Sequence, residues 1–324
     1  MTIDIVTAIN LALSQTLQNS ANTVLLGQDI GKCGGVFRVT EGLQTKFGTK
    51  RVIDTPISES LLAGMAVGMS THGLRPIVEF QFMGFLYPAL DQIINHLARM
   101  KNRTRGRLSC PSVLRMPYGG GIGAPEHHSE STEALLAHIP GLKVVVPSTP
   151  TQAYHLLIEA ANCNDPVIFL EPKRIYRSVR EKLDTEPTAT SASQPRVVIP
   201  GNDLTIIAWG AMLHDTIEAS KQLNRQGIYP EIIDLVTLSP LNLTLAYESV
   251  SKTNRCLIIH EACESFGVGA EVGYRIFDHC FNYLEAPVKR LCSPDITIPY
   301  SKMEHHYYPQ INDIIQTSQA LVEY

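Results

Sequence analysis

The sequence predicts an α/β protein of two domains, each built on a mostly parallel sheet with helices on both faces. Short apolar segments typical of strands alternate with longer segments of helical periodicity along the chain. The length of 324 residues suits two domains, because a domain averages about 150 residues. A segment rich in Ser, Thr and Pro, near residues 176–202, interrupts this alternation.

The first domain is expected to cover residues 1–180. It begins with a helix, because Val6, Ile9, Leu13 and Leu17 recur at helical spacing. The expected strands, all short and apolar, are 24–28, 51–54, 76–82, 112–115, 143–146 and 167–170. The other expected helices are 59–71, 86–100 and 151–162. Helix 59–71 has almost no polar face, so we expect it to be buried on all sides.

Residues 181–202 are expected to link the domains, because few large apolar side chains occur there before Val197. The second, smaller domain is expected at 203–324. Its expected strands are 204–208, 231–235, 256–260 and 288–291, and its expected helices are 212–225, 268–281 and 310–322.

Composition argues against several classes of protein. With 27 basic and 31 acidic residues, the net charge is −4, so no nucleic-acid partner is expected. Apolar stretches are far shorter than the ~20 residues of a membrane helix, and the first residues resemble neither a secretory signal nor a transit peptide. The seven cysteines form no CxxC pair, which indicates reduced thiols in a cytoplasmic protein. The charged fraction of 18% is low, which favours a subunit interface.

The segment DTPISES at 54–60 follows a strand and opens a helix. One interpretation is helix capping, in which Ser58 accepts hydrogen bonds from first-turn amides and Glu59 interacts with the helix dipole. The other is functional: a carboxylate at a strand-to-helix junction, partly removed from water, would keep a proton or share one with a nitrogen base.

Two glycines, Gly64 and Gly68, lie one turn apart in the same helix. Such spacing allows close approach of another helix. That second helix could come from this chain or from a partner subunit.

The segment GGGIGA at 119–124 matches the dinucleotide-binding pattern only formally. Pro125 follows at once, and no acidic residue stands about 20 positions beyond. In EHHSE at 126–130, adjacent histidines point in different directions, and no third ligand has standard metal spacing. A polar surface loop is one interpretation, and a general acid or base at a strand end is the other.

Many short motifs in order make the whole chain resemble the beta subunit of the thiamine-diphosphate-dependent dehydrogenase of 2-oxo acid dehydrogenase complexes. The matching segments are GQDIG at 27–31, GGVF at 34–37, DTPISE at 54–59, GLRP at 73–76, DQI at 91–93, HS at 128–129, PGLKVV at 140–145, EPKR at 171–174, GAM at 210–212, IDL at 233–235, TLSP at 237–240, HEA at 260–262, LEAP at 284–287 and PD at 294–295.

The resemblance implies a thiamine-diphosphate-binding fold, with a pyrimidine-binding domain followed by a smaller transketolase C-terminal-like domain. It also implies two alpha and two beta chains, with each active site between an alpha and a beta. The chain has no Gly-Asp-Gly motif followed by Asn about 30 residues later. In this family the alpha subunit holds the magnesium and the diphosphate, which accounts for that absence.

The resemblance assigns roles to particular residues. Glu59 matches the glutamate that hydrogen-bonds a nitrogen of the aminopyrimidine ring, and Ile57 and Phe85 match cofactor-binding positions beside it. His128 matches a histidine that delivers a proton during acyl transfer to the lipoyl group of the acyltransferase. His127 is left as its neighbour, because relatives often have another residue there.

Two further features are implied by relatives. Some carry a potassium ion on main-chain carbonyls; the corresponding residues are Ser112, Ala160, Ala161, Cys163 and Asp165. The alternative there is a plain helix terminus with nothing bound. The dihydrolipoyl acyltransferase is expected to dock near Glu285 and the terminal carboxylate of Tyr324.

The expected activity is that of the pyruvate dehydrogenase (acetyl-transferring) beta subunit, because segment 82–87 and the loop at 124–129 look most like bacterial pyruvate-type members. A branched-chain 2-oxo acid or acetoin dehydrogenase beta subunit is the alternative. A non-catalytic scaffold is disfavoured because both Glu59 and His128 are present. A stand-alone enzyme like transketolase is disfavoured because the chain is short and lacks the diphosphate motif.

Overall fold

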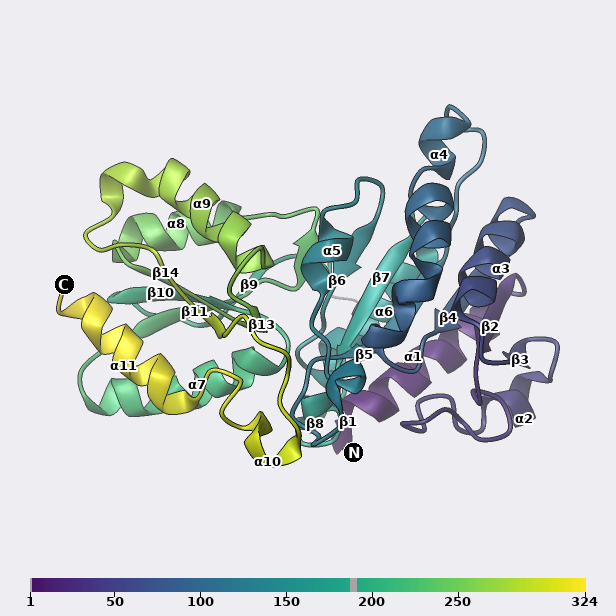
Figure 1. The fold of residues 1–324 in the computed structure, drawn as a ribbon, viewed down its shortest axis with the longest axis horizontal. Coiled ribbons are helices and arrows are strands. Elements are labelled where there is room, and N and C mark those ends of the chain that lie inside the picture. Colours follow the sequence, from purple (N-terminus) through teal and green to yellow (C-terminus); the bar gives the residue numbers. More distant parts are fainter. Residues whose placement is uncertain (1, 187–190) are drawn as a thin grey trace.

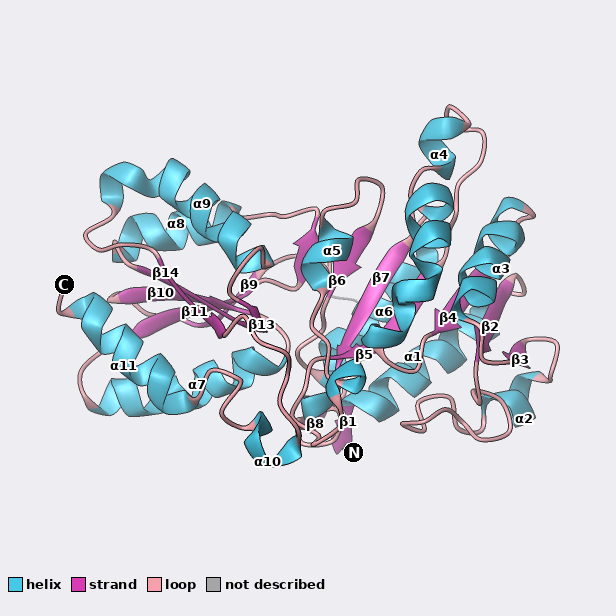
Figure 2. Ribbon diagram, viewed as in Figure 1, coloured by secondary structure: helices cyan, strands magenta, loops and turns pink. Residues whose placement is uncertain are grey.

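The computed structural model describes residues 2–186 and 191–324, which form two sheets side by side, each between helical layers (Figure 1). Figure 2 shows the seven-stranded sheet in the right half of the view and the five-stranded sheet in the left half, on the side of the C-terminus. A separate antiparallel pair joins β1 (Thr2–Asp4) to β8 (Arg180–Lys182). The expected α/β architecture is confirmed.

The first sheet has seven strands in the order β12-β6-β7-β5-β4-β2-β3. They are β2 (Thr23–Gly27), β3 (Val52–Asp54), β4 (Arg75–Glu79), β5 (Val113–Tyr118), β6 (Lys143–Val145), β7 (Val167–Pro172) and β12 (Thr237–Ser239). All pairs are parallel except β12 with β6. Parallel strands bury both faces, which explains their continuous apolar runs.

Helices cover both faces of this sheet. One face carries α1 (Ile5–Asn19) and α6 (Pro150–Asn162), which pack on each other. The other carries α3 (Glu59–Thr71), a 3₁₀ segment η1 (Met83–Ala89) and a π-helical segment η2 (Gln92–Leu97). Short helices complete this part: α2 (Leu43–Phe47), α4 (Met100–Arg103), α5 (Glu133–Ala137), η3 (Glu126–His128) and η4 (Lys173–Ile175).

The second sheet has five strands in the order β14-β13-β10-β11-β9. They are β9 (Arg196–Ile199), β10 (Leu204–Ala208), β11 (Pro230–Asp234), β13 (Cys256–Cys263) and β14 (Lys289–Ser293). Helices α7 (Ala211–Arg225) and α11 (Ile311–Val322) cover one face, and α8 (Thr244–Thr253) and α9 (Val268–Cys280) cover the other (Figure 1). Short η5 (Phe281–Tyr283) and α10 (Ser301–Glu304) follow.

The structure differs from the sequence-based expectation in the middle of the chain. The expected linker contains parts of β8 and the whole of β9, which pairs antiparallel with β11. Edge strands need only a few apolar residues, so Val197, Val198 and Ile199 gave a weak signal. Pro187, Thr188 and Thr190, which contributed to the linker expectation, lie outside the described residues.

The expected helix 86–100 is wrong as a single α-helix. Residues 83–103 form η1, η2 and α4 in succession. Pro88 lies inside the first of these segments, where it provides no amide hydrogen for an α-helical bond. Among the described residues, no helix combines the length and the apolarity needed to cross a membrane.

Candidate active site

Three parallel strands of the first sheet, β3, β4 and β5, end at the same edge. β3 leads into α3, β4 leads into η1, and β5 leads into the glycine-rich loop and η3. Because ligands in open α/β sheets bind beyond the carboxyl ends of strands, this edge is the candidate active site.

The turn between β3 and α3 is fixed by Asp54. Its carboxylate accepts the amide hydrogens of Gly31 at 2.6 Å and Lys32 at 3.3 Å. Ser58 is the N-cap residue of α3, but its side chain makes no capping hydrogen bond. The capping interpretation of Ser58 is therefore wrong.

Glu59 is the first residue of α3 and is half-buried. No hydrogen bond or ion pair joins its carboxylate to another of the described residues. Two residues before it, Ile57 is 74% exposed. A carboxylate with unused acceptor capacity next to an exposed apolar side chain can bind a nitrogen-containing ring.

Helix α3 is not buried on all sides, so that expectation is wrong. Leu62, Ala63 and Ala66 pack on the first sheet, whereas Leu61 is 44% exposed. A methyl group added to Gly68 would meet nothing within 4 Å. This face of α3 is apolar and no other part of the described chain packs over it at Gly68. An exposed apolar surface of this kind is typical of a contact with another protein.

Segment η1 approaches η3 very closely at Gly84. A Cβ there would lie 2.2 Å from the carbonyl oxygen of His127. Ser60 of α3 donates to the carbonyl oxygen of Pro88 in η1. The start of α3, η1 and η3 therefore form one packed unit that carries the predicted Glu59, Phe85 and His128.

His128 packs between two aromatic rings. Its ring centroid lies 4.5 Å from that of Phe82 and 5.2 Å from that of Phe85, both edge to face. His128 Nδ1 is buried without a hydrogen-bond partner in the described structure. His127 instead has a side chain 67% exposed, 4.0 Å from Glu126. The two adjacent histidines thus differ, since His128 packs against aromatic rings whereas His127 is exposed.

A group of buried ionisable side chains lies between the two sheets, and sequence analysis did not identify it. Burial raises the pKa of Glu133 to about 8 and raises that of Glu261. Burial lowers the pKa of Lys173 to about 8. Each of these side chains has a polar atom without a hydrogen-bond partner in the described residues. Lys173 and Glu261 lie in the EPKR and HEA motifs, but no local pattern places them near Glu133, because the three residues are far apart along the chain.

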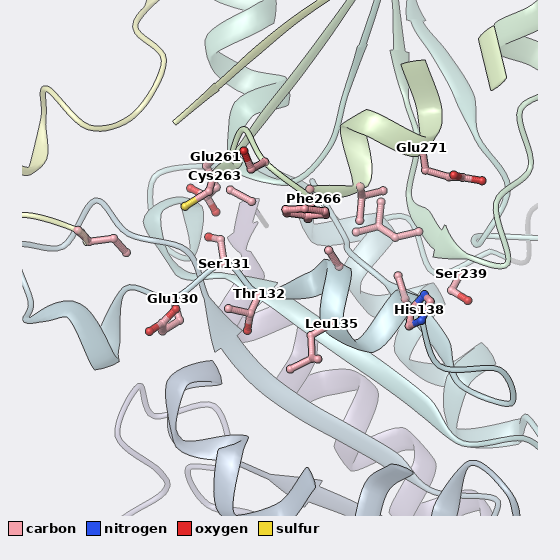
Figure 3. Close-up of a pocket in the computed structure, with 18 of the residues that line it drawn as sticks. Glu130, Ser131, Thr132, Leu135, His138, Ser239, Glu261, Cys263, Phe266 and Glu271 are labelled. Carbon is pink, nitrogen blue, oxygen red and sulfur yellow. The ribbon is translucent and has the colours of Figure 1, made fainter. Parts of the chain in front are cut away.

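A cleft of about 1100 Å³ borders the loop that carries His128. Figure 3 shows Glu130, Ser131 and Thr132 on one side and Glu261 and Cys263 on the other. The cleft is therefore lined by both halves of the chain, next to the proposed catalytic loop.

The five predicted potassium ligands lie around the end of α6, where a protein cation is already present. Arg75 Nη1 donates to the carbonyl oxygens of Ala161 at 3.1 Å and Cys163 at 3.0 Å. The carbonyls of Ser112 and Ala160 accept from Val167 and Cys163 amides, and the Asp165 side chain pairs with Lys101. The potassium site stays a prediction. No group of three His, Cys, Asp or Glu side chains within 2–186 and 191–324 is placed to hold a metal ion.

Both predicted docking residues, Glu285 and Tyr324, lie at the surface. Arg255 pairs with Glu285 at 3.0 Å and donates to the carbonyl oxygen of Leu321, in the last turn of α11. Tyr324 is 76% exposed. One arginine thus connects Glu285 to the C-terminal end of the chain.

Comparison with known proteins matches both halves of the chain. Residues 1–179 match the family model of the transketolase pyrimidine-binding domain, and residues 194–314 match that of the transketolase C-terminal domain. One solved structure, a split-gene transketolase described as an inactive beta4 tetramer, has a TM-score of 0.80. It covers 99% of this chain and 98% of its own at 23% identity, so it shows the fold alone.

Curated relatives are more similar. A protein of Acholeplasma laidlawii named pyruvate dehydrogenase E1 component subunit beta is 46% identical over 95% of this chain and 94% of its own length. The protein of that name from Bacillus subtilis is 43% identical over 98% of both chains. The resemblance drawn from the motifs is thereby confirmed: this chain belongs to the family of pyruvate dehydrogenase E1 beta subunits, with a transketolase-type pyrimidine-binding domain followed by a transketolase C-terminal domain.

Proposed function

We propose that the chain is the beta subunit of a pyruvate dehydrogenase. With an alpha subunit, it would carry out thiamine-diphosphate-dependent oxidative decarboxylation of pyruvate and acyl transfer to the lipoyl group of the acyltransferase. The observation that carries the proposal is 40–46% identity over nearly the whole chain to proteins of that name. Seven free cysteines fit a reducing cytoplasm.

The residues at the sheet edge fit the cofactor. Thiamine diphosphate, when bound, supplies the electron sink that allows carbon dioxide to leave a 2-oxo acid. Glu59 would hold a proton against a nitrogen of the aminopyrimidine, and its free carboxylate supports this role. Low local polarity strengthens such a charge-assisted bond. Ile57 and Phe85 would contact the ring. The magnesium and diphosphate would be held by alpha.

His128 would hold and release a proton during acyl transfer. Its contacts with Phe82 and Phe85 fix the ring plane, and an imidazole exchanges protons near neutral pH. The unpartnered Nδ1 supports a role toward a bound group rather than toward this chain.

The proposed assembly contains two alpha and two beta chains. The open face of α3, with Leu61 and Gly68, supports a covering helix from a partner subunit rather than from this chain. The acyltransferase would dock near Glu285 and Tyr324, where Arg255 connects the two regions.

The test is reconstitution with the alpha subunit. Decarboxylation of pyruvate should be absent with this chain alone, present with alpha, and reduced at least about 100-fold by Glu59→Gln. Glu218→Gln is the matched control, because Glu218 is exposed on α7 and pairs only with Lys221 among the described residues. Activity in the chain alone, or full activity of Glu59→Gln, would contradict the proposal.

Substrate choice needs a separate comparison. The value of kcat/KM should be higher for pyruvate than for 3-methyl-2-oxobutanoate in the reconstituted enzyme. A clear preference for the branched-chain acid would overturn the assignment of pyruvate and leave the subunit class intact.

A further inference from the structure

The glycine-rich loop after β5 presents two amide groups to one carboxylate. Glu304 Oε1 accepts the amide hydrogen of Gly121 at 2.7 Å, and Glu304 Oε2 accepts that of Gly123 at 2.7 Å. Glu304 is only 5% exposed and ends α10, in the C-terminal half of the chain. Converging backbone amides form an anion-binding concavity, and here a side chain of the same protein fills it.

The loop can take this shape only because its residues are glycines. Gly119, Gly121 and Gly123 have φ of +77°, +83° and +70°, a region that side chains disfavour. A Cβ on Gly120 would lie 1.4 Å from the hydroxyl oxygen of Tyr308. Glu304 and Tyr308 thus hold the loop from the other domain.

The same loop carries His128. Its two ends are joined, because the amide of Gly119 donates to the carbonyl oxygen of Glu130 at 2.8 Å. Inside it, the amide of His128 donates to the carbonyl of Pro125 at 2.9 Å, and Ser129 Oγ donates to that of Ala124 at 3.3 Å. A displacement of Gly121 and Gly123 is therefore transmitted to the turn that orients His128.

We propose that Glu304 is a positioning residue that orients His128 for acyl transfer by binding the amides of Gly121 and Gly123. The inference rests on the proposed role of His128. Glu304 is distant in sequence from the loop and touches no atom that would react.

The bidentate contact makes the charge essential. Both carboxylate oxygens accept a hydrogen from the loop, and such charge-assisted bonds are about twice as strong as neutral ones. In Glu304→Gln, the NH2 group of the side-chain amide would face a backbone N–H group, so that two hydrogen-bond donors would oppose each other. In Glu304→Asp, the shorter side chain would reach one of the two amides.

The test uses the reconstituted enzyme and two assays. The first measures pyruvate decarboxylation with an artificial electron acceptor, which does not need acyl transfer. The second measures reductive acetylation of a lipoyl domain. The variants are Glu304→Gln, Glu304→Asp, His128→Asn, the double variant Glu304→Gln/His128→Asn, and Glu218→Gln as the surface control.

We expect Glu304→Gln to slow reductive acetylation by 10- to 100-fold, since small misplacements of a reacting group cost that much. Decarboxylation should change by less than about threefold, and Glu304→Asp should fall between Glu304→Gln and the parent enzyme in the acetylation assay. In the His128→Asn background, adding Glu304→Gln should have no further effect, because Glu304 acts only through His128.

Failure of this inference and failure of the proposed function give different results. If His128→Asn does not slow acetylation selectively, the proposed role of His128 is wrong. If His128→Asn does so but Glu304→Gln slows both assays equally, or multiplies the His128→Asn effect, Glu304 has only a structural role and the inference is overturned. Should Glu304→Gln fail to assemble, Glu304→Asp decides by the same criteria.

Discussion

Arg115 is the residue on which the polar interior of the first sheet depends. It lies on β5 and is 2% exposed, between Glu79 of β4 and Glu171 of β7. Its Nη1 donates to Glu79 at 2.8 Å and its Nη2 to Glu171 at 3.1 Å. The hydroxyl of Tyr176 donates to the same Glu171 oxygen. One cation therefore pairs with two buried carboxylates.

Arg115→Met should lower the free energy of unfolding by about 3–5 kcal/mol, because both carboxylates would stay buried without a counter-charge. Urea denaturation followed by circular dichroism measures the change. Arg107→Met, at an exposed arginine, should change it by no more than about 0.5 kcal/mol. Equal effects of the two variants would contradict this account.

The protonation of Glu133 should make the stability of the folded protein depend on pH. Burial, followed by the nearby Glu261, raises its pKa from 4.5 to about 8. The folded protein thus holds a proton that the unfolded chain releases above about pH 4.5. Its contribution to stability is complete below pH 4.5 and is lost as pH rises toward about 8.

Glu133→Gln should therefore become more stable relative to the parent as pH rises from 5 to 8. The difference should grow by at least about 1.4 kcal/mol, the equivalent of one pKa unit. Thermal melts at several pH values measure it, with Glu218→Gln as a control that shows no such trend. A difference that stays constant with pH would mean that Glu133 is charged when folded.

Local sequence motifs were sufficient to select two of the candidate site residues. Glu59 follows a strand and opens a helix, and His128 follows the glycine-rich loop, so both could be selected from local motifs. Glu304 and Glu133 could not. Glu304 contacts Gly121 and Gly123, and Glu133 lies near Glu261, so in both cases folding brings together residues from distant segments.

Among the elements, α3 has two different faces. Leu62, Ala63 and Ala66 contact the sheet, whereas Gly68 has open space where a side chain would extend. The helix was expected to be buried because its residues are apolar, and composition alone cannot tell which chain provides the cover.

The substitution Gly68→Leu should affect assembly with the alpha subunit without impairing the folding of this chain. In the chain alone, the melting temperature should stay equal or rise, because Leu favours a helix by up to about 1 kcal/mol over Gly. Binding of the alpha subunit should weaken at least tenfold, because the close approach of a helix is blocked. Titration with alpha followed by calorimetry measures this. Normal assembly of Gly68→Leu would show that the open face is not the interface.

Other elements were predicted with unequal success for physical reasons. Long amphipathic helices such as α1 and α6 have a strong repeating pattern. The periodic residues Val6 to Leu17 lie within α1, and the helix expected at 151–162 is α6, at Pro150–Asn162. β12 has three residues, and its partner β6 is far away in sequence. Its pairing depends on tertiary contact, which no local pattern records.

At the scale of the whole molecule, the two halves of the chain are joined by a shared apolar core and by one strand that the second half adds to the first sheet. β12 lies in the second half of the sequence but pairs with β6 of the first sheet. One apolar cluster contains Leu114 of the first sheet together with Ile258 of the second. Length and composition predict two domains, and they hold no information on how strongly the domains depend on each other.

The chain should consequently unfold in a single cooperative transition. Scanning calorimetry should give one peak, with the calorimetric enthalpy equal to the van't Hoff enthalpy. A protein cut into independent domains would give two. Two well-separated peaks would show that the shared core contributes little to stability.

The position of β12 also limits how such subunits can recombine. A chimera joined at residue 202 would place a strand from one parent against β6 from the other, and an imperfect fit would leave that sheet edge open to aggregation. A junction placed after Ser239 would keep β12 with β6 and β9 with β11, and would combine strands of two parents only where β10 pairs with β13. Exchange of genetic segments between relatives is therefore expected to succeed more often with a junction after Ser239 than with one at residue 202.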